Sequence, residues 1–334
     1  MSIDLTLIWA GIIAFAVFMY VLMDGFDLGV GILFPYAPHH HDRDVMMNSV
    51  APFWDGNQTW LVLGGGGLLA AFPLAYAIIL PALYIPLLVM LIALIFRGVA
   101  FEFRFKANTS RHLWDKSFHF GSVLATFAQG AALGAFIQGF EISGRDYVGG
   151  PFAWVTLFSL LTGVGLIAGY ALLGAGWLIL KTEGDLQAWA YKVAKPLLIA
   201  VLIFIAIVSI ATPLAENDIA RRWFSWPNIV YLSPVPLITA LLAFGIWRAL
   251  IRKQEKRPFI FTMGLFALSY LGLGISLWPK VVPPDITIWQ AAAAPESQIF
   301  MLWGAGFLVP IMLIYIAYNY WVFRGKVRPG EGYH

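Results

Sequence analysis

The chain contains no cysteine, and only 12% of its 334 residues are charged. The missing cysteines exclude disulfides, thiolate catalysis, iron–sulfur clusters and sulfur-ligated zinc. Soluble domains carry about 25% charged residues, so this chain lacks the polar surface that a water-soluble fold of its size needs. Because 60% of the residues are hydrophobic and 32 are glycine, we expect one polytopic membrane domain over residues 1–334, with no nucleic-acid partner.

Long apolar runs, separated by charge clusters, Pro and Gly, divide the chain. A helix needs about 20 apolar residues to span a bilayer, and by this measure the sequence predicts an all-α integral membrane protein with nine transmembrane helices. Since no Lys or Arg precedes the first run, we expect it to remain as a helix and not to be a cleaved signal peptide. The predicted spans are 5–34, 48–72, 74–104, 118–140, 153–180, 196–215, 230–250, 259–278 and 298–323.

Lys and Arg are distributed unevenly over the predicted loops. The second, fourth, sixth and eighth connections together hold four, whereas the odd-numbered connections and the C-terminal tail hold sixteen of the 21. Cytoplasmic loops of membrane proteins are enriched in Lys and Arg. We therefore predict that the N-terminus lies outside, in the periplasm, and the C-terminus in the cytoplasm, with an unstructured tail at 324–334.

Four charged residues fall inside predicted spans and away from the span ends: Asp24 and Asp27 in the first, Asp55 in the second and Arg97 in the third. Such charges are expensive in a bilayer and usually functional. Asp24 and Asp27 are three residues apart and so share one helix face. Counted at about 1.5 Å per residue, Asp27, Asp55 and Arg97 each lie roughly 10 Å from the cytoplasmic end of their helices. We therefore expect these side chains to form one cluster.

Asp55 is followed closely by two amides, Asn57 and Gln58. Carboxylates and amides at this depth can hold a chain of water and suit proton uptake. Arg97 and Glu102 are the expected charge partners, although Glu102 stands near its helix end and is expected at the surface. The alternative is structural: the carboxylates pair with an arginine and only tie helices together.

The histidines offer no evident haem ligand. Five of the six fall in predicted loops or the tail (His39, His40, His41, His112 and His334), and His119 stands at the start of the fourth span without an obvious partner. A haem protein of this kind is expected to place His or Met ligands opposite one another within its helices. We therefore expect no cofactor and no metal bound by this chain. The glycines at 64–67 are expected to permit close helix packing.

Three stretches carry a resemblance to a known family: DGFDLGVG at 24–31, PFWDGNQTWL at 52–61 and FRGVAFE at 96–102. Together they resemble subunit II of the cytochrome bd quinol oxidases. The resemblance implies a terminal oxidase of the bacterial inner membrane that oxidises quinol and reduces oxygen with protons from the cytoplasm. It also implies that haem b and haem d, or a haem b variant, belong to a partner subunit I. Small single-helix accessory subunits, quinone and lipid are further partners that it allows.

Within this resemblance, the functional carboxylates of the family correspond to Asp27 and Asp55, and Asp24, Asn57 and Gln58 stand beside them. They would form part of a proton path toward the haems of subunit I. The chain itself would contribute no catalytic residue and would pack against subunit I as a pseudo-symmetric heterodimer.

Trp60, next to the Asp55 motif, is a candidate wall of an oxygen route, with ordinary packing as the alternative. Two other functions stay open. A proton-coupled secondary transporter could also use membrane carboxylates, but it is expected to show inverted repeats and a midplane site, whereas here the charges are off-centre and no repeat is evident. A scaffold with inert carboxylates is the other possibility.

Overall fold

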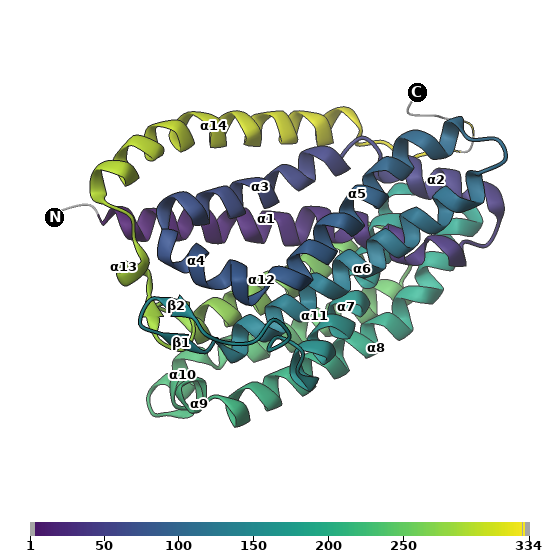
Figure 1. The fold of residues 1–334 in the computed structure, drawn as a ribbon. Helices are drawn as coiled ribbons and strands as arrows, with labels where there is room; N and C mark the ends of the chain where they lie inside the picture. The colour runs from purple at the N-terminus through teal and green to yellow at the C-terminus, as the bar shows by residue number, and fades with distance from the viewer. Residues whose placement is uncertain (1–3, 329, 331–334) are drawn as a thin grey trace.

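The computed structural model describes residues 4–328 and 330 of the chain. Long helices run side by side between two ends of a bundle, and two short hairpins lie at one of these ends (Figure 1). The helices are α1 (Leu5–Leu33), η1 (Phe34–Tyr36), α2 (His40–Val50), α3 (Trp54–Ala71), α4 (Pro73–Ala82), α5 (Tyr84–Lys106), α6 (Arg111–Gln138), α7 (Leu157–Lys181), α8 (Gly184–Ala215), α9 (Asn217–Phe224), α10 (Asn228–Leu232), α11 (Pro234–Ile251), α12 (Arg257–Leu277), α13 (Ile288–Ala291) and α14 (Pro295–Val322). The antiparallel hairpins pair β1 (Ile142–Ser143) with β2 (Asp146–Tyr147), and β3 (Lys280–Val282) with β4 (Ile286–Thr287).

Eight helical segments of the described residues are long and apolar enough to cross a membrane. They correspond to eight of the nine predicted spans. The remaining prediction, 48–72, is wrong in its first part: residues 48–50 complete α2, a turn follows, and α3 begins only at Trp54. α3 is not apolar enough to be counted among these eight segments, because its first half carries Asp55, Asn57 and Gln58.

The predicted span 74–104 is confirmed only in its second part, α5, because the apolar run is broken into α4 and α5 at Leu83. Pro81 lies inside α4 and Pro86 near the start of α5. A proline removes a backbone donor and its ring clashes with the preceding turn. The two prolines therefore explain why a continuous apolar run does not form one continuous helix.

Several helices extend beyond the apolar runs. α6 begins at Arg111, and α8 begins at Gly184 and passes through Pro196, which was expected to mark a boundary. His40 and His41, expected in a loop, begin α2, and His112 lies in α6. Hydropathy locates the part of a helix that faces lipid, whereas polar residues continue these helices at the bundle ends.

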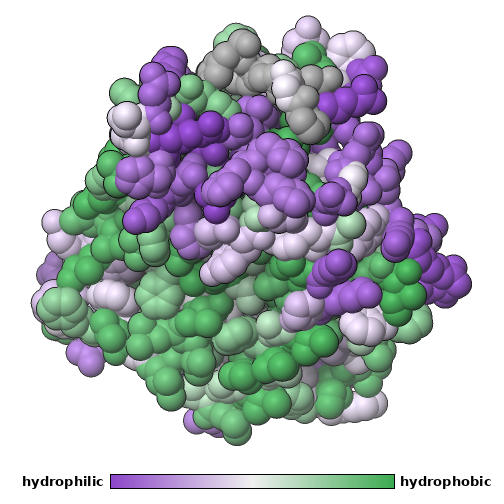
Figure 2. All heavy atoms as spheres, turned by 90° about the vertical axis from the view of Figure 1, so that its right-hand side faces the viewer, coloured by the Kyte–Doolittle hydropathy of each residue, from purple (hydrophilic) through white to green (hydrophobic). Residues whose placement is uncertain are grey.

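The loops between helices meet at two ends of the bundle. At one end, the side chain of Lys326 in the C-terminal segment reaches Glu255 in the α11–α12 loop, with 2.8 Å between Nζ and Oε1. At the other end, Trp289 Nε1 donates to Asp4 Oδ2 at 2.9 Å. Figure 2 views the first of these ends, where hydrophilic residues gather over the upper part and hydrophobic residues predominate over the lower part.

The C-terminal segment at this end has no regular secondary structure in its described part. It is nevertheless bonded to the bundle: the Val327 amide donates to Lys181 O at 2.8 Å, and Lys181 Nζ donates to Gly325 O at 2.6 Å. Residues 329 and 331–334 of the predicted tail, which include His334, lie outside the described residues.

Close packing between α1 and α7 depends on glycine. A Cβ atom at Gly29 would lie only 1.8 Å from the backbone oxygen of Tyr170, and one at Gly174 would lie 2.3 Å from the carbonyl carbon of Gly29. No side chain fits at this crossing, so the two backbones can approach more closely than larger residues would allow. This approach buries the second half of α1, which carries both carboxylates.

Candidate functional site

Asp24, Asp27, Arg97, Asn57 and Tyr320 form a group that we call the buried cluster. Arg97 Nη1 donates to Asp24 Oδ1 at 2.7 Å, and Arg97 Nη2 lies 3.8 Å from Asp27 Oδ2. The side chains of Asp24, Asp27 and Arg97 are all 0% exposed. The expected meeting of these three charges, from α1 and α5, is therefore present in the structure.

Asn57 of α3 connects the charges to α14. Its Nδ2 donates to Asp27 Oδ2 at 2.7 Å and to Met23 O at 3.2 Å. Its Oδ1 accepts a hydrogen bond from Tyr320 Oη at 3.0 Å. The Tyr320 ring in turn stacks on Phe53, with 4.3 Å between the ring centroids. The sequence reasoning missed Tyr320, and the only available signal was that Asn319 and Tyr320 are polar residues near the end of an apolar span.

The buried cluster has one guanidinium for two carboxylates. Four of its buried polar atoms have no hydrogen-bond partner within the described part of the chain, namely Asp24 Oδ2, Asp27 Oδ1, Arg97 Nε and Arg97 Nη2. Buried polar groups in proteins almost always have a partner, from the protein or from ordered water. The cluster is therefore both short of positive charge and only partly hydrogen-bonded by protein.

The other carboxylates and amides predicted for the site lie elsewhere. Asp55 is exposed in the first turn of α3, Gln58 is half-buried, and Glu102 is exposed and 3.6 Å from Lys106. Asp55 precedes Asn57 by two residues, which is about 200° around a helix. Its level in the bundle is close to that of Asp27, but its side chain points to the opposite side of α3 from the cluster.

Trp60 is 0% exposed and packs edge-on against Phe15, with 5.6 Å between ring centroids. Within the glycine run, a Cβ at Gly67 would lie 3.1 Å from Ile13 of α1, whereas Gly65 and Gly66 have no atom within 4 Å of that position. The expected close packing therefore holds on the α1 side of α3, and the other two glycines face open space.

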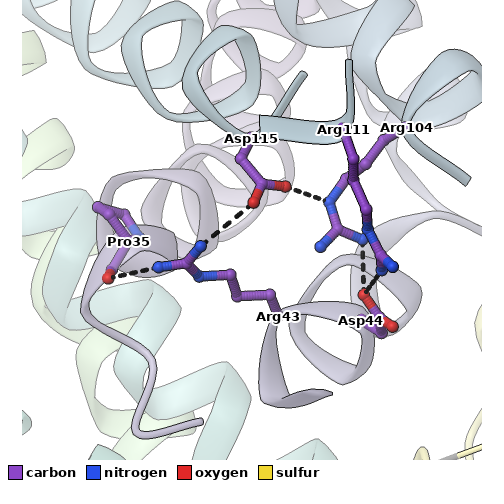
Figure 3. Close-up of polar contacts among 6 residues, drawn as sticks. All are labelled: Pro35, Arg43, Asp44, Arg104, Arg111 and Asp115. Carbon is purple, nitrogen blue, oxygen red and sulfur yellow. Dashed lines mark hydrogen bonds and ion pairs between the residues drawn. The ribbon is translucent and has the colours of Figure 1, made fainter. Parts of the chain in front are cut away.

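A second group of charges, which we call the end network, lies at the end of the bundle shown in Figure 2 and was not foreseen from sequence. Arg104 Nε donates to Asp115 Oδ1 at 2.5 Å and Arg104 Nη1 donates to Asp44 Oδ1 at 2.7 Å. Arg111 also donates to Asp44, and Arg43 Nη1 donates to Asp115 Oδ2 at 3.2 Å. These contacts join α2, α5 and α6 (Figure 3).

Arg43 Nη2 also donates to Pro35 O, so the end network reaches the turn after α1. Partial burial acts to raise the pKa of Asp44, but the hydrogen bonds from Arg111 and Arg104 outweigh it, and the pKa is lowered. Asp44 is therefore held as a carboxylate by its two arginines. Three guanidinium groups share two carboxylates here, the reverse of the charge balance in the buried cluster.

The described histidines do not fit a haem. His39, His40, His41 and His112 are exposed at the bundle end, and His119 Nδ1 lies 3.1 Å from Gly31 O with its ring against Phe120. Within the described ranges, no three His, Asp or Glu side chains are grouped so that they could hold a metal ion.

The fold and the buried cluster define a multi-pass helical membrane protein with ionisable groups enclosed between its helices. A model of the family "Cytochrome bd terminal oxidase subunit II" matches residues 5–323. The chain therefore belongs to this family, and it is a subunit of a terminal oxidase, an oxidoreductase complex. The resemblance found in the sequence motifs is confirmed.

Relatives match over nearly the whole chain. Subunit 2 of the cytochrome bd ubiquinol oxidase of Bacillus subtilis (strain 168) is 30% identical, and the match covers 97% of each chain. Subunit 2 of the cytochrome bd-I ubiquinol oxidase of Escherichia coli (strain K12) is 29% identical, over 97% of this chain and 95% of that one. A chain of the bd oxidase structure from Geobacillus thermodenitrificans superimposes with a TM-score of 0.73 over 96% of this chain and 99% of that chain, and its 17% identity makes it similar in fold alone.

Proposed function

We propose that this chain is the haem-free subunit II of a quinol:oxygen oxidoreductase in a bacterial inner membrane, and that it carries protons toward a haem-bearing subunit I. The relatives are named as second subunits of ubiquinol oxidases, which supports both a quinol substrate and a partner subunit. Haem b and haem d, or a haem b variant, would belong to that partner. The observation that carries the proton path is the buried cluster with its incomplete hydrogen bonding.

The chemistry of the buried cluster suits a proton store. One guanidinium balances one carboxylate, so a proton on the second carboxyl would make the group neutral. The unpartnered atoms of Asp24, Asp27 and Arg97 are positions where ordered water would complete the hydrogen bonding. Such water would let a proton enter and leave Asp27, while Asn57 holds the other carboxylate oxygen in place.

Asp55 would contribute to a different part of the proton path. An exposed carboxylate on the side of a membrane bundle is costly unless a partner or water meets it. Exposed residues form a stripe along α3 at positions that recur every three or four residues: Asp55, Thr59, Val62, Gly65, Gly66 and Leu69. We infer that subunit I covers this α3 stripe, so that Asp55 lies at the subunit interface and Asp27 inside this chain.

The two open glycines provide a test of the interface. Gly65→Leu and Gly66→Leu should leave this chain folded, since no atom lies near the added Cβ. If a helix of subunit I packs closely on the stripe, the larger side chain should reduce copurification of the haem-bearing subunit by about tenfold, as overpacking by 1–3 kcal/mol predicts. Gly274→Leu, at an equally open position of α12, is the matched control. Normal recovery of haem with both stripe variants would exclude this interface.

The proton path is tested by neutral substitutions of the two carboxylates. Asp27→Asn and Asp55→Asn should slow quinol-driven oxygen consumption per haem by about tenfold or more, because a lost proton-transfer group commonly costs this much. The visible haem spectrum should be retained. Glu102→Gln, an exposed carboxyl paired with Lys106, is the control and should leave the rate unchanged. Unaltered turnover in all three variants would leave the carboxylates with a purely structural role.

We also propose nine membrane crossings, with the N-terminus in the periplasm and the C-terminus in the cytoplasm. α3 would supply the ninth: its start lies beside α1 through the Asn57–Asp27 bond, and its end at Ala71 accepts from the Ala293 amide at the opposite end. Its polar half would cross the membrane enclosed by α1, α14 and subunit I. The excess of Lys and Arg in the loops of one end supports the orientation.

We also propose that Trp60 forms part of the wall of an oxygen route, which its complete burial beside α1 and α14 supports. Accessory single-helix subunits, a bound quinone and lipid remain allowed partners of the complex. The transporter alternative is not favoured, because the family model and the curated relatives are oxidase subunits.

A further inference from the structure

A partly open pocket of about 370 Å³ lies at the end of the bundle opposite the end network. The last residues of α6, α9, the end of α12 and β3 line it. Five charged residues of both signs line it: Glu216, Asp218, Arg221, Arg222 and Lys280. Its volume falls in the range of small-molecule sites, and nothing in the proposed proton path uses it. We call it the α9 pocket.

Two of the charges are already paired, and two are not. Lys280 Nζ donates to Asp218 Oδ2 at 3.1 Å. The exposed side chain of Arg221 and the half-buried side chain of Glu216 make no hydrogen bond or ion pair with any described residue. Arg222 is fixed in place, since its Nη1 donates to Ile275 O at 2.8 Å and also to Trp278 O. The pocket therefore presents one unpaired carboxylate and one unpaired guanidinium beside a rigidly held second guanidinium.

The surroundings of the α9 pocket are those of a membrane surface. α9 follows directly after α8, a helix long and apolar enough to span the bilayer. Leu214 is 80% exposed, Phe224 62% and Trp226 80%. Large exposed aromatic and aliphatic side chains next to Arg and Lys are typical of the layer between lipid tails and water.

We propose that the α9 pocket binds the headgroup of a phospholipid that carries a phosphodiester and a primary ammonium group. The phosphate lies against Arg221 and Arg222, and the ammonium lies against Glu216. The acyl chains run along Leu214 and Phe224 toward the hydrocarbon layer.

The charges favour this occupant over simpler ligands. A free metal cation would meet three basic residues and only one unpaired carboxylate, and a free phosphate would meet Glu216 as a repulsive neighbour. Burial raises the pKa of Glu216, and the nearby Asp218 raises it further against a smaller opposing effect of Lys280. An ammonium group next to Glu216 supplies the counter-charge that this side chain lacks.

The proposal is tested on the detergent-purified, delipidated complex by native mass spectrometry, with phosphatidylethanolamine and phosphatidylglycerol added in turn. Glu216→Gln should lower retention of phosphatidylethanolamine about fivefold, the effect of one solvent-accessible ion pair, and should not lower retention of phosphatidylglycerol, which has no ammonium group and is repelled by the Glu216 carboxylate. Arg221→Gln should lower retention of both lipids. Arg145→Gln, in the exposed turn of the β1–β2 hairpin at the same end, is the matched control and should behave as the parent chain.

Two results would overturn the proposal. One is equal retention of both lipids by the parent chain, Glu216→Gln and Arg221→Gln. The other is displacement of phosphatidylethanolamine by the same concentration of soluble phosphoethanolamine, which would assign the pocket to a water-soluble ligand. Both substituted side chains face the pocket and solvent, so the thermal melting curve of each variant should match that of the parent and separate loss of binding from loss of folding.

Discussion

The buried cluster and the end network are built from the same residue types, aspartate and arginine, but their charge balance and hydrogen bonding differ. In the buried cluster, one guanidinium serves two carboxylates, and four polar atoms have no partner among the described residues. In the end network, three guanidinium groups surround Asp44 and Asp115, and both carboxylates receive two donors each.

This difference separates the roles that the two groups can have. A carboxylate surrounded by arginines stays ionised, so the end network suits a permanent tie between α2, α5 and α6. A carboxylate that shares one arginine with a second carboxylate can hold a proton, and its free oxygen can accept from water. Of the two groups, the buried cluster is therefore the one that fits the proposed proton path.

The largest effect is expected from removing Arg97. Arg97→Met should lower the free energy of unfolding by about 3–5 kcal/mol, because two buried carboxylates would then face one another without a cation. SDS-induced unfolding of the purified complex in mixed micelles measures this change. In the Asp24→Asn background the same substitution should cost much less, since one of the two charges is already absent. A loss below about 1 kcal/mol in the parent chain would indicate that both carboxyls are already neutral.

The sequence gives the level of the charges in the membrane but not the direction in which each side chain points. Asp24, Asp27 and Arg97 meet because two of them share a helix face and the third lies at the same depth. Asp55 lies at nearly the same level yet points outward. The rotation of α3 about its own axis is set by its packing on α1 through Gly64 and Gly67, and this contact joins residues far apart in the sequence. Counting residues from the helix end therefore predicts Asp55 in the buried cluster, whereas Asn57 occupies that position in the structure.

Hydropathy likewise identified the lipid-facing helices but not their polar extensions. The short α2, with Asp42, Arg43 and Asp44 in its first half, has no apolar run and was missed. The end network was missed with it, since two of its members are on α2. Tyr320 reaches Asn57 across a sequence separation of 263 residues, and no local pattern indicates such a pair.

A smaller effect is expected in the end network. Arg104 is buried and donates to both Asp44 and Asp115. Arg104→Gln should therefore lower the free energy of unfolding by about 1–2 kcal/mol, the range for loss of charge-assisted hydrogen bonds whose partners still reach solvent and other arginines. Arg111→Gln is the matched control: its side chain is 44% exposed, so it should cost less than about 1 kcal/mol. Equal losses from the two variants would contradict the assignment of Arg104 as the central member.

The smallest expected effect is a loss of stability in acid that depends on Asp44. The folded-state pKa of Asp44 lies below its ordinary value, so its contribution to stability is complete above about pH 4, the pKa of an unfolded aspartate, and is lost as the pH falls through the folded-state value. Because Asp44 is 38% exposed, this contribution should stay below about 1 kcal/mol. Melting temperatures at pH 7, 5 and 3.5 should show a smaller acid-induced decrease for Asp44→Asn than for the parent chain. An identical decrease in both proteins would mean that acid acts through other carboxyls. The carboxyls of the buried cluster, which share one guanidinium, would then be the next candidates.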